Sequence, residues 1–507
     1  MKPKTTLGFY LVVAQFFLMA EAMAMPVHTT HELIVKYREA SLEDILSNKG
    51  SASTPAFILR LSVTKNLKLH KAFPSFNIYA FEMPAGKNVD EMMRELEDDP
   101  NVEFSEPNYV IKTDRFSLTA FALESSRSID SLGVFELKPQ ATDPILVGVV
   151  DTGIDTTHPA LQSRIWMNTQ EISSNGRDDD GNGYIDDIQG WNFADGTNDA
   201  FDDNGHGTHV AGIISGVSTF TVDTTSNFKL VPLKFLDADG TGTTLGAISA
   251  ISYGLQIGVK VFNNSWGGGG FSMALHDVMT QAYEKGVLMV VAAGNESQDL
   301  EISPTYPASF EHPNLISVAA TTTAGNLAWF SNYGKSSVDL GAPGVSIYST
   351  LPDGKYGTMS GTSMATPNIS RMAMLMMDQN RSLSVFQIKK IMMETVTAES
   401  SLAEVTVSGG GVNMTQALAM SQLAEADGEI PPYTPSFLSL SPPEETQKEV
   451  SMGPSGCGFL DTSGPSPWDS GSTISLLLVI FALVLVQVPA RVKFSHLTSD
   501  GLEVSFK

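Results

Sequence analysis

The run Ile145-Leu-Val-Gly-Val-Val150 is continuously apolar and ends directly at Asp151. Similar runs follow along the chain, and helix-like stretches separate them. Continuous rather than alternating apolar runs are typical of parallel strands that are buried on both faces. Residues 144–425 are therefore predicted to form an α/β domain, a parallel sheet with helices on both faces. The other runs are Lys229–Phe235, Val259–Phe262, Val287–Ala293 and Leu315–Ala320, and the helix-like stretches are Thr244–Gly254, Ala274–Glu284 and Ser363–Met377.

The groups that a hydrolytic serine needs lie in this domain: a base, a carboxylate that orients the base, and donors for an oxyanion. Asp151 opens Asp-Thr-Gly after the first strand, and His206 opens His-Gly-Thr-His-Val-Ala-Gly. Ser363 lies in Gly-Thr-Ser-Met-Ala-Thr-Pro, where Pro367 predicts that the serine stands at a helix start. Asn295 follows the fourth run, and its amide can donate to an oxyanion.

These four segments together resemble the motifs of the subtilisin-like serine proteases (subtilases), and the resemblance covers residues 144–420. Each motif alone is weak, but the four in the family's order are specific, and Asp, His, Ser is the order known for subtilisin. The resemblance implies that Ser363 attacks a peptide carbonyl while His206 transfers the proton. Asp151 then fixes the imidazole, and an acyl-enzyme forms and is hydrolysed.

Neighbouring residues offer simpler interpretations. Asp155 and His158 are interpreted as structural, because the family's catalytic aspartate is the one in Asp-Thr-Gly. His209 lies one turn after His206 and is an alternative base. The methionines between residues 372 and 377 are interpreted as core packing.

The substrate cleft is inferred from the same resemblance. Extended peptides often add as strands to exposed sheet edges, and two segments resemble the strands that flank a subtilase substrate. Thr305, just before Tyr-Pro, is expected near the floor of the pocket for the residue before the cut. Since no carboxylate is obvious there, an apolar or small residue is favoured. The predicted substrate-binding residues are Gly240, Thr241, Gly242, Ser265, Trp266, Gly267, Ala292, Ala293, Gly294 and Thr305.

Residues 31–112 are predicted to form a separate small α+β domain, since strand, strand, helix and strand patterns follow one another. The domain resembles the inhibitory subtilase propeptide, whose end enters the active-site cleft and is then cut off. The cut is expected within 111–126, and residues 113–143 are interpreted as the maturation region and N-terminal lead-in. The alternative is a binding domain that stays attached. The four patterns are His31–Tyr37, Phe76–Phe81, Asp90–Leu96 and Asn101–Ser105.

An acidic segment, 178–187, is predicted to bind a structural Ca²⁺ ion. Its acids, asparagine and glycine match positions 1, 3, 5 and 6 of a calcium loop, although position 12 is Gln189 rather than glutamate. Similar acidic insertions in subtilases look calcium-binding. The alternative is a solvated acidic loop. The predicted ligands are Asp178, Asp180, Asn182, Tyr184 and Asp187.

Both ends of the chain carry export or membrane signals. Residues 1–24 read as a signal peptide, with an uncleaved anchor as the alternative. A disordered stalk is expected at 426–472, a transmembrane segment at 473–490 and a cytoplasmic tail at 491–507. A buried core helix is the alternative to the span. The predicted location is periplasmic or cell-surface, with membrane anchoring that is at least transient.

Cys457, shortly before the predicted span, adds a possible processing signal. Cys-Gly, a span and then a basic residue resemble the C-terminal sorting tails of some Gram-negative bacteria, although residues 492–507 extend beyond that pattern. The alternative is an unmodified cysteine on a single-span anchor. As the lone cysteine of the chain, Cys457 also excludes an intrachain disulfide.

The net charge and the complete set of motifs limit the classes of function that the sequence supports. The formal net charge of −25 argues against nucleic acid as a partner. An active endopeptidase is the main hypothesis, with protein or peptide substrates and its own propeptide as inhibitor. An inactive surface-binding module and an esterase are the competing ones; the intact motifs count against the first, and the peptide-binding segments and propeptide-like domain against the second.

Overall fold

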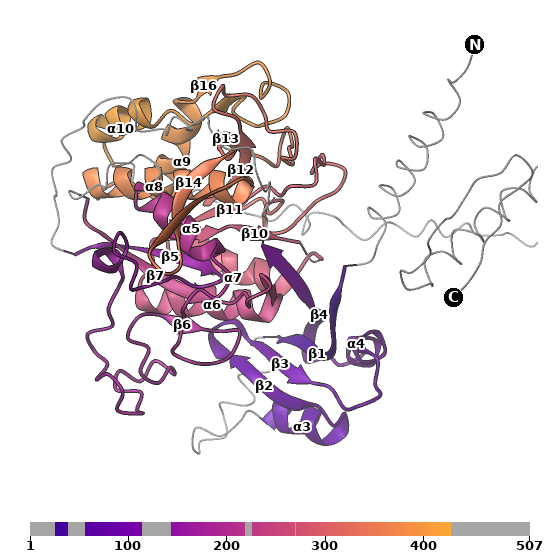
Figure 1. The fold of residues 1–507 in the computed structure, drawn as a ribbon. Helices are drawn as coiled ribbons and strands as arrows, with labels where there is room; N and C mark the ends of the chain where they lie inside the picture. The colour runs from indigo at the N-terminus through magenta and orange to yellow at the C-terminus, as the bar shows by residue number, and fades with distance from the viewer. Residues whose placement is uncertain (1–25, 39–55, 114–142, 218–225, 269, 427–507) are drawn as a thin grey trace, which may run out of the picture. The chain divides into compact units, whose positions relative to one another are not determined.

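The computed structural model describes residues 26–38, 56–113, 143–217, 226–268 and 270–426 (Figure 1). The predicted signal peptide, transmembrane segment and cytoplasmic tail lie outside these residues, as does all but the first residue of the predicted stalk. Within the described ranges, no helix is both long enough and apolar enough to cross a membrane.

The small N-terminal domain is an antiparallel sheet in the order β4-β1-β3-β2. Alternate residues of β1 point to opposite faces: Leu33 and Val35 pack with the domain's own helices, whereas Ile34 belongs to a core shared with the α/β domain. The Asn88 side chain caps α4 by accepting a hydrogen bond from the Asp90 amide at 2.8 Å. The elements are β1 (His28–Tyr37), α3 (Ala56–Thr64), β2 (Lys68–Phe73), the 3₁₀ turn η1 (Pro74–Phe76), β3 (Ile78–Glu82), α4 (Val89–Glu97) and β4 (Val102–Thr113).

A nine-stranded sheet in the order β16-β17-β13-β12-β11-β9-β5-β7-β6 forms the second domain. All its neighbouring strands run parallel except β16 and β17, so the predicted parallel α/β fold is confirmed as a mostly parallel one. The strands are β5 (Ile145–Asp151), β6 (Trp191–Asn192), β7 (Phe228–Lys234), β9 (Val261–Asn264), β11 (Leu288–Ala292), β12 (Leu315–Thr321), β13 (Leu340–Pro343), β16 (Thr397–Ala398) and β17 (Gly410–Gly411).

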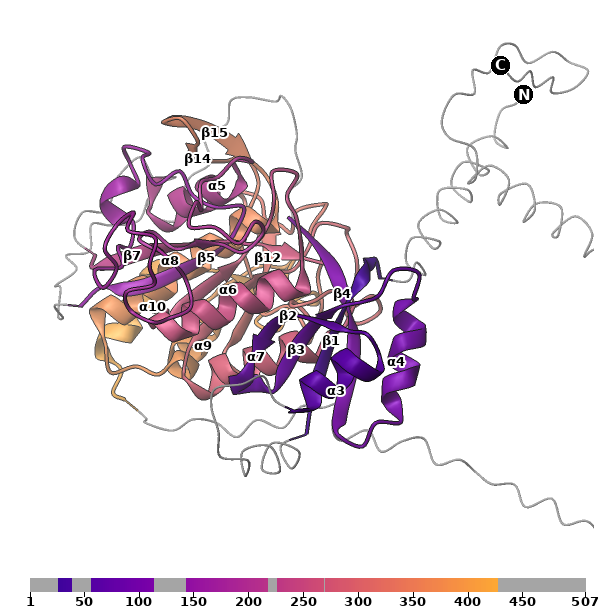
Figure 2. The same ribbon diagram turned by 90° about the horizontal axis from the view of Figure 1, so that it is seen from below.

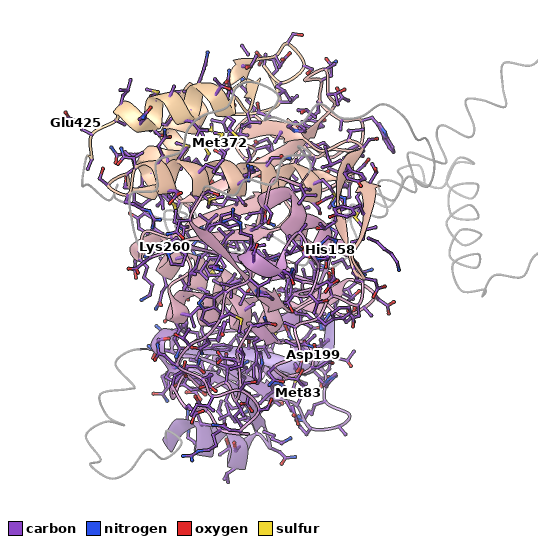
Figure 3. The ribbon with its side chains drawn as sticks, turned by 60° about the vertical axis from the view of Figure 1, so that its left-hand side comes forward. Met83, His158, Asp199, Lys260, Met372 and Glu425 are labelled. Carbon is purple, nitrogen blue, oxygen red and sulfur yellow. The ribbon has the colours of Figure 1, made fainter. Side chains whose placement is uncertain are left out.

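Helices cover both faces of this sheet. On one face, Val147 and Val149 of β5 pack in a core with α5, α8, α9 and α10, the first group of helices. Val150 belongs to the core on the opposite face. On that opposite face α6 and α7 lie side by side (Figure 2). The methionines of the central helix, Met372 among them (Figure 3), are buried as expected. The first group is α5 (His206–Ile214), α8 (Thr362–Gln379), α9 (Val385–Glu394) and α10 (Met414–Leu423); the second is α6 (Thr244–Ile257) and α7 (Met273–Glu284).

The small domain contains more secondary structure than the sequence patterns predict. Helix α3 and strand β2 were not expected, and β4 continues eight residues past the predicted end, to Thr113. The extension forms because β4 also pairs with strands of the α/β domain, β8 (Thr241–Thr243) and β10 (Trp266–Gly267). A β-hairpin of β14 (Ile347–Leu351) and β15 (Lys355–Met359) completes the description.

Candidate active site

An aspartate and a histidine meet at the carboxyl end of β5. Asp151 is the last residue of that strand and His206 the first of α5, and both side chains are fully buried. The distance between His206 Nδ1 and Asp151 Oδ1 is 2.7 Å, and the Thr152 amide donates to the same oxygen. Gly207 allows this approach, since a Cβ there would lie 2.1 Å from the Gly153 carbonyl oxygen. The pair is therefore held in one orientation away from water.

Ser363 lies in the first turn of α8, as expected from Pro367. Pro367 has no N–H to donate to the Ser363 carbonyl, and the Ser265 hydroxyl donates to that oxygen instead, at 3.0 Å. The Ser363 hydroxyl in turn donates to the Ser265 carbonyl at 3.1 Å. Among the described residues, the buried His206 Nε2 has no hydrogen-bond partner. Bonds between a resting nucleophile and its base often tighten only with substrate, so this geometry is compatible with a serine–histidine pair.

Asn295 lies beside the start of α8. Its side-chain oxygen accepts hydrogen bonds from the Thr362 amide at 2.9 Å and from the Thr362 hydroxyl at 3.1 Å. The oxygen is thereby engaged, so the amide NH₂ is the end of this side chain that can donate to an oxyanion.

The neighbouring histidines and aspartate have structural partners. His209 Nε2 lies 3.3 Å from the Gly357 carbonyl, and burial lowers the pKa of His209 to about 3, which makes it a poor base. His158 contacts the Lys355 carbonyl. Asp155 accepts hydrogen bonds from the Thr157 amide and hydroxyl and from the Asp353 amide. These contacts agree with the structural interpretation of Asp155 and His158.

A strand of the small domain occupies the predicted substrate cleft. The end of β4 pairs antiparallel with β8 on one side and with β10 on the other. Lys112 is opposite Gly267, Thr113 is opposite Trp266, and the Thr113 amide donates to the Gly240 carbonyl at 2.9 Å. The segments 240–242 and 265–267 thus flank an extended peptide, here one from the same chain.

The other predicted cleft residues lie at the end of β11. Gly294 has a φ of +104°, and a Cβ there would lie 2.3 Å from Asn332 Nδ2, so the turn requires glycine. Thr305 approaches the Ala293 carbonyl with its hydroxyl at 3.4 Å. Segment 292–294 and Thr305 are therefore neighbours. Ile111 of β4 is buried in the same core as Trp266.

The same strand caps two helices of the α/β domain. Glu106 accepts hydrogen bonds from the Ser272 hydroxyl and from the amides of Met273 and Ala274, at the start of α7. Asn108 accepts one from the Leu245 amide at the start of α6. Burial raises the pKa of Glu106 to about 7 despite these hydrogen bonds. Sequence motifs did not identify this contact, because its partners lie more than 130 residues away.

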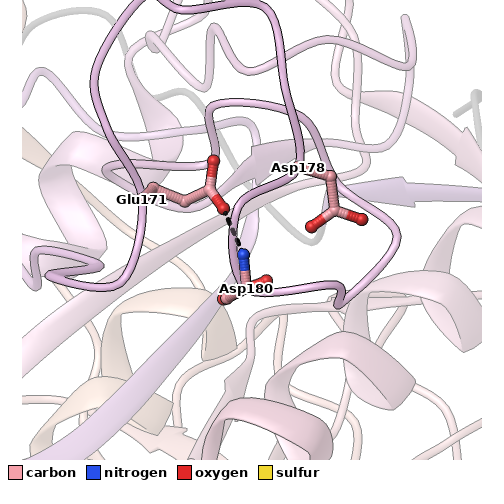
Figure 4. Close-up of side chains that lie close together, drawn as sticks. All are labelled: Glu171, Asp178 and Asp180. Atoms are coloured by element: carbon pink, nitrogen blue, oxygen red, sulfur yellow. Dashed lines mark hydrogen bonds between the residues drawn. The ribbon is translucent and has the colours of Figure 1, made fainter.

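Three carboxylates come together in the acidic segment. Oxygen atoms of Glu171, Asp178 and Asp180 lie within 4.8 Å of one another, and Glu171 accepts a hydrogen bond from the Asp180 amide (Figure 4). Glu171 was not predicted, since it precedes the calcium-loop pattern by seven residues. Asp187 is fully buried and accepts hydrogen bonds from Tyr253, Asn182 and other side chains. The predicted ligands Asn182 and Tyr184 follow Asp180 in the same loop.

This donor set fits Ca²⁺, which prefers carboxylate and amide oxygens. Within the described residues, none of the three clustered carboxylates forms an ion pair with a lysine or arginine. A bound cation would offset their mutual repulsion. Backbone amides already fix the carboxylates: Asp178 accepts from Gly181, Asn182 and Gly183.

Comparison with known proteins places both domains in known families. The model of the Subtilase family matches residues 142–417, and that of the Fervidolysin N-terminal prodomain matches residues 27–108. Thermitase from Thermoactinomyces vulgaris is 36% identical over 241 residues, covering 47% of this chain and 76% of thermitase. A thermophilic serine proteinase from Bacillus sp. (strain AK1) is 32% identical over 303 residues, 58% of this chain and 68% of the relative. Subtilisin DY from Bacillus licheniformis is 33% identical over 256 residues, which cover 50% of this chain and 84% of subtilisin DY.

Proposed function

Because the chain belongs to the subtilase family, whose members are serine endopeptidases, we propose that it cleaves peptide bonds with Asp151, His206 and Ser363 as its catalytic triad. The observation that carries the proposal is the buried Asp151–His206 pair at the end of β5, with Ser363 at the start of α8. A strand of the chain's own N-terminal domain lies in the adjoining cleft, which supports a peptide substrate rather than a small ester.

The residues of the triad and Asn295 have different roles in the proposed reaction. The Ser363 oxygen attacks the peptide carbonyl, and His206 Nε2 takes its proton and passes it to the leaving amine. Asp151 keeps the hydrogen on His206 Nδ1 and stabilises the imidazolium. The Asn295 amide and the Ser363 backbone N–H donate to the oxyanion at the helix start, where negative charge is favoured. Water then hydrolyses the acyl-enzyme.

The N-terminal domain is the proposed inhibitor and maturation device. Its match to a prodomain implies a zymogen, and β4 blocks the cleft as an added strand. The last described residue of β4, Thr113, lies opposite Trp266, next to Ser265, whose carbonyl accepts a hydrogen bond from the Ser363 hydroxyl. We therefore expect the maturation cut shortly after Thr113 and no later than residue 126.

The experiment is to express residues 25–430 with Ca²⁺ and to follow chain mass, casein cleavage and labelling by a fluorophosphonate. Labelling of Ser363, loss of about 90 to 100 N-terminal residues, a new N-terminus shortly after Thr113 and casein cleavage are expected. A folded chain that stays full length, unlabelled and inert would instead favour the binding module. Labelling with ester but no casein turnover would favour the esterase. A new N-terminus before residue 112 or beyond residue 127 would refute only the expected position of the cut.

We further propose that Ca²⁺ binds at Glu171, Asp178 and Asp180 and stabilises the fold. At a hundredfold excess over its dissociation constant, calcium should stabilise the chain by about 2.7 kcal/mol. That corresponds to a melting temperature higher by roughly 4 to 5 °C than after chelation. Calorimetry of the wild type and Glu171→Gln, with and without chelator, checks this. Asp179→Asn is the control, because Asp179 lies in the loop but outside the cluster. A calcium shift that survives Glu171→Gln would contradict the assignment.

Prodomain release should depend on the protonation of Glu106. The pKa of Glu106 is about 7 in the docked state, against an ordinary 4.5 when free, so its contribution to docking is full below pH 4.5 and is lost as pH rises through 7. A difference of this size corresponds to roughly 3 kcal/mol, or about 300-fold in affinity.

Gel filtration of the processed complex between pH 5 and 8 should show faster release at higher pH. Glu106→Gln should flatten that dependence, because the amide has no proton to gain in this range. Release that is equally pH-dependent in Glu106→Gln would place the effect elsewhere.

Export and anchoring remain proposals from the sequence, with the enzyme outside the cytoplasm or on the cell surface. The signal peptide at 1–24 and the span at 473–490 both lie outside the described residues. Mass analysis of the exported chain tests the signal peptide, and a retained N-terminus would refute it. Membrane fractionation tests the span, and a full-length chain recovered without membrane would refute it.

A further inference from the structure

The ammonium group of Lys71 is held by aromatic rings. Lys71 lies on the edge strand β2 of the N-terminal domain and is half-buried. Its Nζ lies 5.6 Å from the ring centroid of Phe193, 5.9 Å from that of Tyr184 and 5.8 Å from that of Phe73. Burial lowers its pKa to about 8, and no carboxylate of the described residues offsets that effect. The faces of the rings, which carry negative charge density, are therefore its main stabilising contacts.

Of these three rings, Tyr184 lies in the acidic segment 178–187, Phe193 directly follows β6, and Phe73 belongs to β2 itself. Tyr184 makes edge contacts with Trp191 and Tyr253, at centroid distances of 5.0 and 4.8 Å, and Phe193 lies 5.8 Å away. These contacts fix the ring orientations. A cavity of about 700 Å³ adjoins the rings and is lined by both domains.

Hydrogen bonds continue from these rings to the carboxylate cluster. The Tyr253 hydroxyl donates to Asp187 at 2.5 Å, and the Asn182 amide donates to both Asp187 and Asp180, at 2.9 and 3.0 Å. Asp180 is one of the three clustered carboxylates. A contiguous set of contacts thus leads from the prodomain's Lys71 to the candidate calcium site.

We propose that Tyr184 and Phe193 form a docking site for Lys71 that couples the seating of the N-terminal domain to calcium binding by the acidic loop. The inference rests on the proposed calcium site, but not on proteolysis. An ordered loop presents the ring faces to Lys71, and a docked Lys71 in turn favours the ordered loop. Coupling of this kind is reciprocal, so each event strengthens the other by the same factor. The anchor lies outside the cleft, and cutting the chain after β4 leaves it in place.

The test uses the full chain with Ser363→Ala, so that no cleavage intervenes. Hydrogen–deuterium exchange is measured for peptides covering β2 and 178–187, with and without Ca²⁺. Calcium should protect both peptides when Lys71 is present. Lys71→Met should lower the protection of β2 by roughly 3- to 30-fold, the range of a cation–π contact, and remove its calcium response. Lys71→Arg should retain both.

Lys68→Met is the matched control, because Lys68 lies on the same strand but is exposed and pairs with Glu82. It should leave both the β2 protection and its calcium response unchanged. Titration calorimetry with Ca²⁺ gives the reciprocal measurement: Lys71→Met should weaken calcium binding by the factor by which calcium raises β2 protection in the parent chain. Phe193→Leu, added to Lys71→Met, should weaken calcium binding little further.

Unchanged β2 protection or an unchanged calcium response in Lys71→Met would overturn the coupling, while the proposed protease would stand. Absence of calcium binding in the parent chain would overturn the inference together with the calcium site. Proteolysis is not measured, so neither outcome can be confused with failure of the proposed protease function.

Discussion

Ser363→Ala is expected to leave a folded chain that neither cuts itself nor cleaves casein. The hydroxyl donates to the Ser265 carbonyl, and losing such a bond costs about 1 kcal/mol of folding free energy. Without the nucleophile, turnover should fall by roughly 10⁶-fold, the scale that the same change has in subtilisin. Intact mass and casein turnover, measured beside circular dichroism, check both halves of this expectation.

Ser360→Ala is the matched control for this change. Ser360 is also buried, three residues earlier, and its hydroxyl accepts a hydrogen bond from the Ser346 amide. It should process and cleave like the wild type. Processing by Ser363→Ala in a purified, protease-free preparation would mean that the nucleophile lies elsewhere.

Asp151→Asn is expected to lower kcat by roughly 10⁴-fold and to leave KM nearly unchanged. The buried carboxylate accepts from His206 and from the Thr152 amide, and an asparagine of the same shape supplies no negative charge. The imidazolium that forms during attack then lacks its counter-charge in a site closed to water. Steady-state kinetics on a peptide substrate, after maturation in trans, separates the two constants.

Asp155→Asn tests whether the choice between the two nearby aspartates is right. Asp155 holds Thr157 and Asp353 by backbone hydrogen bonds, and it should change stability more than kcat. A loss of kcat in Asp155→Asn that matches the loss in Asp151→Asn would contradict the proposed role of Asp151.

Much of the α/β domain could be predicted from the sequence because its signals are local. The five apolar runs correspond to β5, β7, β9, β11 and β12, with ends that differ by at most two residues. Strands buried on both faces must be apolar throughout, so each run is visible without knowing its neighbours. Pro367 similarly marked the helix start that carries Ser363.

The parts that were missed depend on distant partners. Strand β2 is an edge strand with exposed Lys68 and His70, so its pattern is mostly polar. The end of β4 contains Pro107 and Asn108, which break a strand pattern, yet it extends because β8 and β10 pair with it. Glu171 joins the carboxylate cluster through chain folding, and no spacing in the sequence reports it.

The sequence by itself determined the class of fold, the order of the motifs and the residue types proposed for catalysis, since these follow from local apolar patterns and short segments. Only the tertiary structure decided in which register the end of the N-terminal domain lies in the cleft, and that Glu106 caps α7 while Lys71 contacts Tyr184 and Phe193. Those contacts join residues more than a hundred positions apart. They form because burial and hydrogen bonding stabilise the two domains when they are docked, and no local sequence pattern predicts that docking.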